Sequence, residues 1–156
     1  MTSLKTLFCA ALTSLLTVCA PALAGDTDAG AIRHLMLAQF DRPESRLTVE
    51  PITIHKDIAV AGWAQADMGG RALLRRHGDQ WRLVLCSGDA LKETRALQHF
   101  GLNAEEADAM TKAVIEAEAK LDSTLVAKFS TFDGVMRMDQ DGHHPPVDGQ
   151  SSGHGG

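Results

Sequence analysis

Residues 57–91 read DIAVAGWAQADMGGRALLRRHGDQWRLVLCSGDAL, and this stretch decides the fold of the chain. Three short runs of strand-like alternation are separated by residues 68–70 (MGG) and residues 77–79 (HGD). Glycine at such positions supplies the backbone freedom that tight reversals need. The pattern therefore predicts an antiparallel meander whose chain reverses at these two places.

The last run of the meander, residues 81–86 (WRLVLC), leads into residues 87–89, where a helix is expected to begin. Side chains alternate between the two faces of a strand. Two faces follow: Trp81, Leu83 and Leu85 on one, and Arg82, Val84 and Cys86 on the other. Cys86 is thus expected near the end of this strand, on the face that does not carry Trp81.

The chain before the meander predicts one helix and one edge strand. Residues 26–41 have apolar side chains at helical spacing, and Pro43 prevents continuation; the apolar positions are Ile32, Leu35, Met36 and Phe40. Residues 47–54 alternate weakly around Pro51, whose missing N–H donor restricts such a strand to the edge of a sheet. Residues 55–57 then form a hairpin tip.

The chain after the meander predicts helices. Residues 89–100 form a short helix that ends at Gly101, and Asn103 with Glu106 forms a capping box for the next one. The apolar stripe of that helix is Ala107, Met110, Val114, Ala117 and Leu121. Asp122 or Ser123 caps a last short helix, which ends before Gly134.

These elements predict an α+β fold. An N-terminal helix packs on a curled antiparallel sheet of about four strands, as in cystatin-like or nuclear-transport-factor-like folds, and two or three C-terminal helices and a flexible tail follow. The expected organisation is a signal peptide over residues 1–24, one α+β domain over residues 25–139, and a disordered Gly/His/Pro tail over residues 140–156.

The N-terminus has the features of an exported protein. A short apolar run follows Lys5 and ends in the small-x-small sequence Ala22-Leu23-Ala24, which predicts cleavage before Gly25 and a periplasmic location. The alternative is a lipoprotein processed at Cys19, but the bulky residues before that cysteine disfavour it. Once the signal peptide is removed, no stable membrane insertion is expected.

Composition excludes some partners. The chain of 156 residues has a formal net charge of -5 and no long cluster of Lys and Arg, so nucleic acid is not an expected partner. The nearest approach to such a cluster is a local patch on the predicted hairpin, consisting of Arg71, Arg75, Arg76 and Arg82.

Cys86 is the one cysteine that remains after cleavage, because Cys9 and Cys19 belong to the signal peptide. An internal disulfide is therefore excluded. A lone thiol in an exported protein is a buried hydrophobic side chain, an intermolecular partner, or a soft metal ligand. Burial is the expectation here, and a ligand role for Cys86 stays open.

The segment VMRMDQDGHHPPVDGQSSGHGG (residues 135–156) places five potential metal ligands within nineteen residues: Met136, Met138, His143, His144 and His154. Met-x-Met directs two thioethers to the same side of an extended chain. Thioether sulfur suits copper(I) and imidazole nitrogen suits copper(II), so the segment predicts a copper site. The alternative is that both methionines pack under the last helix and the histidines belong to a polar spacer.

Two blocks of this sequence, MGGRALLRR…WRLVLCSGDAL and MRMD…GHHPP, resemble a family of exported alphaproteobacterial proteins described as copper uptake system-associated proteins. The resemblance covers residues 32–146. It implies a copper context, export, and other periplasmic or membrane copper-trafficking proteins as partners. It supplies no role for individual residues.

Catalysis is not expected. Cys86 has no orienting partners at the spacing of a thiol hydrolase, and neither Gly69-Gly70 nor Ser87-Gly88-Asp89 has the lysine or further glycine of a phosphate loop. The sequence thus favours a copper-binding accessory or chaperone of a copper uptake system. The alternative is an exported small-ligand or protein-binding module with a non-functional polar tail.

Overall fold

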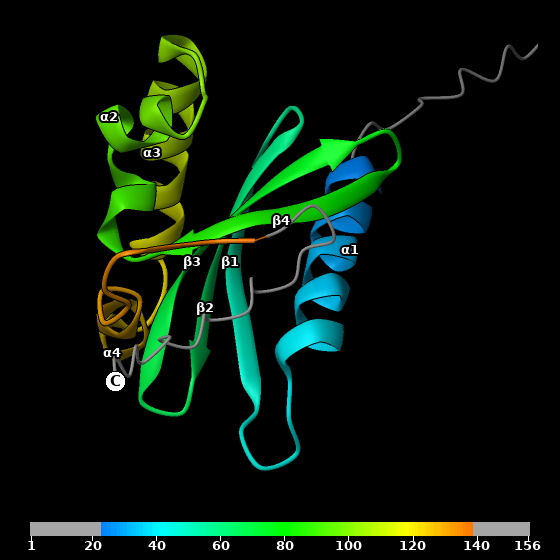
Figure 1. The fold of residues 1–156 in the computed structure, drawn as a ribbon, viewed down its shortest axis with the longest axis vertical. Helices are drawn as coiled ribbons and strands as arrows, with labels where there is room; N and C mark the ends of the chain where they lie inside the picture. Colours follow the sequence, from blue (N-terminus) through cyan, green and yellow to red (C-terminus); the bar gives the residue numbers. More distant parts are fainter. Residues whose placement is uncertain (1–22, 139–156) are drawn as a thin grey trace, which may run out of the picture.

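The computed structural model describes residues 23–138, which form five strands and a set of helices on both sides of the sheet (Figure 1). The strands are β1 (Leu47–His55), β2 (Ile58–Gln65), β3 (Met68–His77), β4 (Gln80–Ser87) and β5 (Val135–Arg137). The helices are α1 (Leu23–Phe40), the 3-10 helix η1 (Asp89–Lys92), α2 (Thr94–His99), α3 (Ala104–Glu118) and α4 (Ser123–Lys128). The α+β fold predicted from the sequence is confirmed.

Strands β1 to β4 form an antiparallel meander, and β5 pairs with β4, so the order in the open sheet is β1-β2-β3-β4-β5. The expected edge position of Pro51 is confirmed, because it lies in β1, which is the first strand in the sheet order and pairs with β2. The register of β1 and β2 shifts at this proline, between Val49 and Ile52. Strand β5 was not expected. It extends the sheet from the C-terminal side, so that β4 is an inner strand along its last residues.

One of the two predicted reversals of the meander is wrong. The turn between β2 and β3 lies at Ala66 and Asp67, and residues 68–70 belong to β3. Gln65 pairs with Met68, and Ala66 has a positive φ of 52°. The reversal at Gly78, with φ 60°, is confirmed.

The predicted faces of β4 are confirmed for Trp81, Leu83 and Val84 but wrong for Leu85 and Cys86. Leu73 and Leu74 on β3 pair with Leu85 and Leu83, so one residue of β4 is bulged out of register at Val84. A bulge shifts the alternation of all later side chains. Cys86 therefore lies on the same face as Trp81 and Leu83, and Leu85 faces the opposite side.

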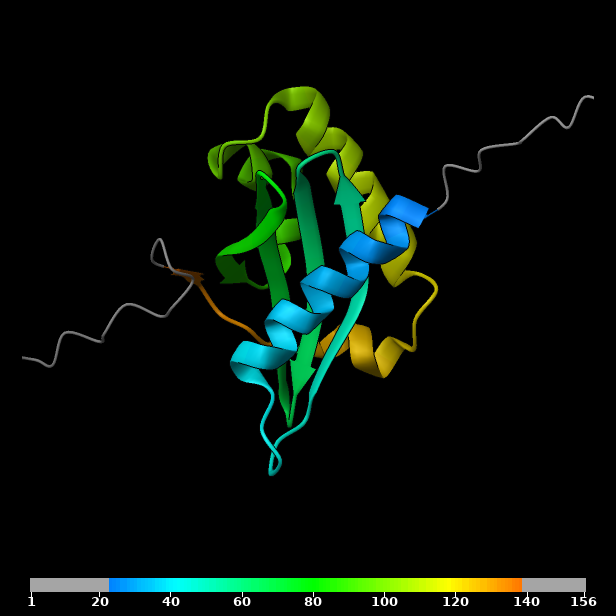
Figure 2. The ribbon, with the colours of Figure 1, turned by 90° about the vertical axis from the view of Figure 1, so that its right-hand side faces the viewer.

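Each face of the sheet has its own hydrophobic core. Helix α1 covers one face with Ile32 and Met36, and η1, α2 and α3 cover the other (Figures 1 and 2). The helix of residues 26–41 is thus confirmed, and its first described turn begins earlier, at Leu23. The capping box of Asn103 and Glu106 is confirmed as well. The expected helix over residues 89–100 is split into η1 and α2 by the extended residue Glu93.

Arg71 is a buried ion-pair partner and not part of a surface patch. Its side chain is fully buried and donates two hydrogen bonds to Glu118 on α3, at 2.6 and 2.7 Å. It also donates to Asp89 at 3.1 Å and to the carbonyl of Phe129 at 3.3 Å. The buried face of α3 therefore continues from Val114 to Glu118. The sequence had predicted Ala117 at this place.

The N-terminal part of α1 is linked to the sheet by a second ion pair. Asp28 accepts a hydrogen bond from Arg76, which lowers the pKa of the Asp28 carboxyl, and another from Trp81 at 3.3 Å. The Arg76 guanidinium lies 4.5 Å from the centre of the Trp81 ring.

None of the helices within residues 23–138 has the length and apolar character needed to cross a membrane.

Candidate metal centre

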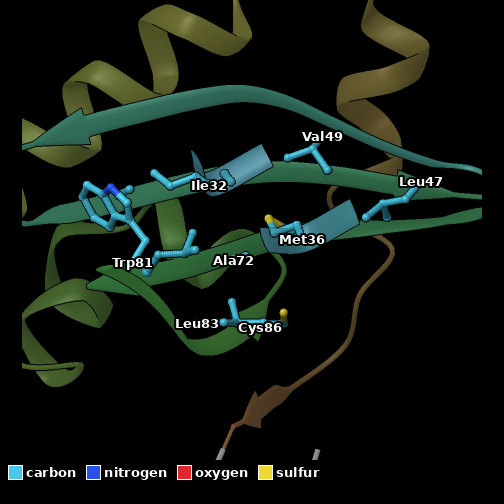
Figure 3. Packing of buried hydrophobic residues seen from close by; sticks show 11 residues of the cluster. Ile32, Met36, Leu47, Val49, Ala72, Trp81, Leu83 and Cys86 are labelled. Atoms are coloured by element: carbon cyan, nitrogen blue, oxygen red, sulfur yellow. The ribbon is translucent and has the colours of Figure 1, made fainter. Parts of the chain in front are cut away.

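A cavity of about 200 Å³ lies between the C-terminal half of α1, the sheet and β5. Four of the nine side chains that line it carry sulfur: Met36, Cys86, Met136 and Met138. The other five are Phe40, Leu47, Trp63, Gln65 and Phe132. Figure 3 shows Met36 of α1 and Cys86 of β4 within the core on this face of the sheet. Residues far apart in the sequence are thus gathered around one apolar space.

Strand β5 brings the two C-terminal methionines to this cavity. Met136 and Met138 line it, while Val135 before them and Arg137 between them are exposed. Met136 is the direct partner of Cys86 in the antiparallel register, and side chains so paired have Cβ atoms about 5 Å apart. The Met138 amide donates to the carbonyl of Val84 at 2.9 Å. The prediction that both methionines face the same side of an extended segment is confirmed.

The segment that delivers β5, residues 129–134, is called the crossover here. Phe129 lies on the α3 side, beside Arg71 and Gly62, whereas Phe132 lines the cavity on the α1 side. A Cβ atom on Gly70 would lie 2.9 Å from the Cβ of Phe132, and one on Gly88 would lie 2.4 Å from the Phe132 carbonyl oxygen. Glycine is needed at both positions for this close approach. Gly70 belongs to the MGG sequence that resembled a turn, so this sequence serves close packing and not a reversal.

Polar side chains fasten the crossover at both ends. Thr131 accepts a hydrogen bond from the Gly69 amide at 3.0 Å, and the Ser130 hydroxyl donates to Asp89 at 2.7 Å. The Ser87 hydroxyl donates to the carbonyl of Gly134 at 2.7 Å, directly before β5. The path of the chain into β5 is therefore defined by side-chain contacts with β3, β4 and η1.

Cys86 is a free, buried thiol with 6% of its surface exposed. Burial disfavours the thiolate and raises the pKa of Cys86 to about 12. The thiol is consequently protonated at neutral pH and is expected to react slowly with thiol reagents in solution. The expectation that Cys86 is buried is confirmed. A ligand role for Cys86 remains a prediction, and three thioethers line the same cavity.

Two further side chains shape the cavity. The Trp63 ring contacts Phe132 edge to face, with ring centres 5.6 Å apart, and its indole N–H is buried without a hydrogen-bond partner. Gln65 donates from its amide to the carbonyls of Phe40 and Ser45, at 2.9 and 2.7 Å. Gln65 thus links the end of α1 to the sheet beside the cavity.

The ligands proposed from the sequence separate into two groups. Cys86, Met136 and Met138 lie together, whereas His143, His144 and His154 lie outside the described residues. Met36, Trp63 and Phe132 were not anticipated as part of a site. Met36 was assigned to the apolar stripe of α1, which is correct, but no local sequence signal indicates that this stripe faces Cys86.

The donor set of the cavity is soft. Within residues 23–138 no group of three or more His, Cys, Asp or Glu side chains is placed to hold a metal ion. Thiolate and thioether ligands favour copper(I), whereas calcium and magnesium require oxygen and structural zinc sites use Cys and His ligands. If the described cavity residues bind a metal, a soft monovalent ion fits them best.

A larger and more open hollow of about 570 Å³ lies between η1, α3 and α4. Its lining includes Ile115, Leu121 and Val126 and contains no sulfur. Glu118 borders it but is already paired with Arg71. Lys92 also lines it and is paired with Asp89, so two of its charged side chains already have partners.

No protein-family model matches the sequence, and no curated protein or solved structure is significantly similar to it.

Proposed function

We propose that this protein is an exported, periplasmic copper-binding accessory or chaperone of a copper uptake system. The observation that carries the proposal is the placement of Met136 and Met138 on one side of β5, where they line a cavity that already contains Cys86. Two thioethers so placed can bind copper(I) together.

The residues after β5 extend the ligand set. His143 and His144 follow Met138 by five and six residues, so even an extended chain keeps them within about 20 Å of it. Imidazole nitrogen accommodates copper(II), which thioethers bind poorly. One segment can in this way serve both oxidation states, with His154 as a dispensable further ligand.

The position of β5 suits a protein that passes its metal on. β5 is a three-residue edge strand whose register pairs join it to β4 alone. Short edge segments open at low free-energy cost compared with the core of a domain. A periplasmic or membrane copper-trafficking partner could therefore reach the methionines by displacing β5, without unfolding the sheet.

A small organic ligand is the second candidate, because aromatic side chains of Phe40, Trp63 and Phe132 line the same cavity. Drug-sized ligands occupy pockets of roughly 300–1,000 Å³. At about 200 Å³ the cavity is below this range, and its sulfur content has no role in such binding. Copper is the better match.

Copper titration of the purified protein tests the proposal. Replacing Met136 and Met138 by isoleucine should weaken copper(I) binding far more than copper(II) binding, since it removes sulfur but not nitrogen. His143→Ala with His144→Ala should do the reverse. Met68→Leu is the matched control, because Met68 is an exposed methionine on β3 outside the cavity.

The proposal fails if the parent does not bind copper, or if both double variants bind both ions as the parent does. In the second case a binding module with a polar tail would be the better description. Export is tested separately by the intact mass of the periplasmic protein, which should begin at Gly25. A diacylated form beginning at Cys19 would contradict this.

A further inference from the structure

We propose that copper(I) is held inside the folded domain, in the cavity, by the thiolate of Cys86 and the thioethers of Met36, Met136 and Met138. This inference deepens the proposed function and rests on it. The copper ligands are then shared between the core and β5, and the centre selects copper(I).

The core supplies two fixed ligands. Met36 on α1 is 1% exposed and Cys86 on β4 is 6% exposed, so the packing around both restricts their movement. The crossover and β5 bring the other two ligands to the same space. Met136 lies directly opposite Cys86 in the register, and Met138 packs against the core cluster that contains Met36 and Cys86. Ligands held by rigid elements bind with less loss of conformational entropy.

Charge balance favours copper(I). Among the described residues that line the cavity, Cys86 alone has an ionisable side chain. A thiolate and a monovalent copper ion together carry no net charge, so the pair can occupy an apolar space at moderate cost. Copper(II) would leave one uncompensated positive charge there, which is strongly disfavoured.

Binding requires a simple exchange of a proton for the metal. The Cys86 S–H bond breaks, its proton leaves to solvent, and a copper–sulfur bond forms while copper stays in the +1 state. The three thioethers donate lone pairs without losing protons. No oxidant or reductant takes part, and one proton is released for each copper(I) bound.

Single substitutions distinguish the shared centre from a site on the C-terminal segment alone. Copper(I) is supplied under anaerobic conditions in competition with a chromophoric copper(I) chelator. Loss of a group that only orients a ligand costs about 10–100-fold in affinity, so Cys86→Ala should weaken binding by about 100-fold or more. Met36→Leu, which removes one thioether and conserves volume, should weaken it by about tenfold.

Met110→Leu is the matched control for Met36→Leu. Met110 is also a fully buried methionine on a helix, but it belongs to the core on the opposite face of the sheet. This variant should bind copper(I) as the parent does. Circular dichroism of each metal-free variant separates loss of a ligand from loss of the fold.

A second measurement needs no change at a proposed ligand. Silver(I), a redox-inert soft ion, should alter the fluorescence of Trp63, which lines the cavity. Trp63→Phe leaves Trp81 as the single tryptophan, near Asp28 at the other end of α1, and its emission should not change on adding silver(I). X-ray absorption of the copper(I) form should show sulfur ligands without nitrogen.

The outcomes separate the two proposals. If Cys86→Ala and Met36→Leu bind copper(I) as the parent does while the Met136 and Met138 variants do not, copper lies outside the cavity. The further inference is then wrong and the proposed function stands. If the unmodified protein does not bind copper(I), both fail. Nitrogen in the copper(I) shell would also overturn the four-sulfur centre.

Discussion

Cys86 determines how copper binding should depend on pH, because it is the one described cavity side chain that can lose a proton. The apolar surroundings that raise its pKa to about 12 keep the thiol protonated across the physiological range. A copper(I) ion bound by Cys86 as proposed must displace that proton, so the proposed centre should bind more strongly as the proton concentration falls.

The expected slope is about a tenfold gain in copper(I) affinity per pH unit between pH 7 and 9.5. An ordinary thiol with a pKa near 8.5 would flatten the curve above that pH. Competition titrations corrected for the chelator's own protonation measure the slope. Cys86→Ala should give none. A flat profile for the parent would show that the thiolate is not a ligand.

At the scale of single elements, the crossover places β5 and so completes the cavity. Its closeness to the sheet depends on the absence of a side chain at Gly88, where a Cβ would lie 2.4 Å from the Phe132 carbonyl oxygen. Nothing comparable exists at Gly30 in α1, where an added Cβ meets no atom within 4 Å. The two glycines form a natural pair for comparison.

Gly88→Ala should lower the free energy of unfolding of the metal-free protein by about 1–3 kcal/mol, because the crossover must move away from the sheet. It should also weaken copper(I) binding, since Met136 and Met138 move with it. Gly30→Ala should instead stabilise the protein by up to about 1 kcal/mol, as alanine is the better helix former. Urea unfolding measures both. Unchanged stability of Gly88→Ala would mean that the crossover tolerates displacement.

At the scale of the whole molecule, the C-terminal part of the chain divides into a portion that packs on the sheet and the residues after it. Residues up to Met138 contribute to the core on the α1 side. Removing residues 140–156 should therefore leave the thermal midpoint of the metal-free protein nearly unchanged. Removing residues 134–156 also removes the contacts of β5 and Met138 with the core and should lower the midpoint by several degrees. About 1 kcal/mol moves the midpoint of a domain of this size by a few degrees.

The same two truncations should differ in their response to copper(I). A ligand at 100 times its dissociation constant stabilises the folded state by about 2.7 kcal/mol. The shorter deletion retains all four sulfur ligands and should keep this stabilisation, whereas the longer deletion should lose most of it. Differential scanning fluorimetry with and without copper(I) measures both. Loss of stabilisation in the shorter deletion would place the principal site beyond residue 139.

Local patterns in the sequence were sufficient for α1, for α3 with its capping box, for the edge position of Pro51 and for the shared side of Met136 and Met138. Each depends on periodicity or on contacts between residues close in the chain. The turn at residues 68–70 was mispredicted because glycine serves both turns and close packing, and only the path of the crossover distinguishes the two uses.

Tertiary structure alone decided which residues share the cavity. A bulge at Val84 turns Cys86 toward α1, and the pairing of β5 with β4 places Met136 opposite it. Neither feature has a local sequence signal. A bulge depends on the partner strand, and the pairing of β4 with β5 brings together residues about fifty positions apart. The sequence by itself determined which residue types were available for copper. Their assembly into one apolar, sulfur-lined space depended on long-range packing, which no periodicity records.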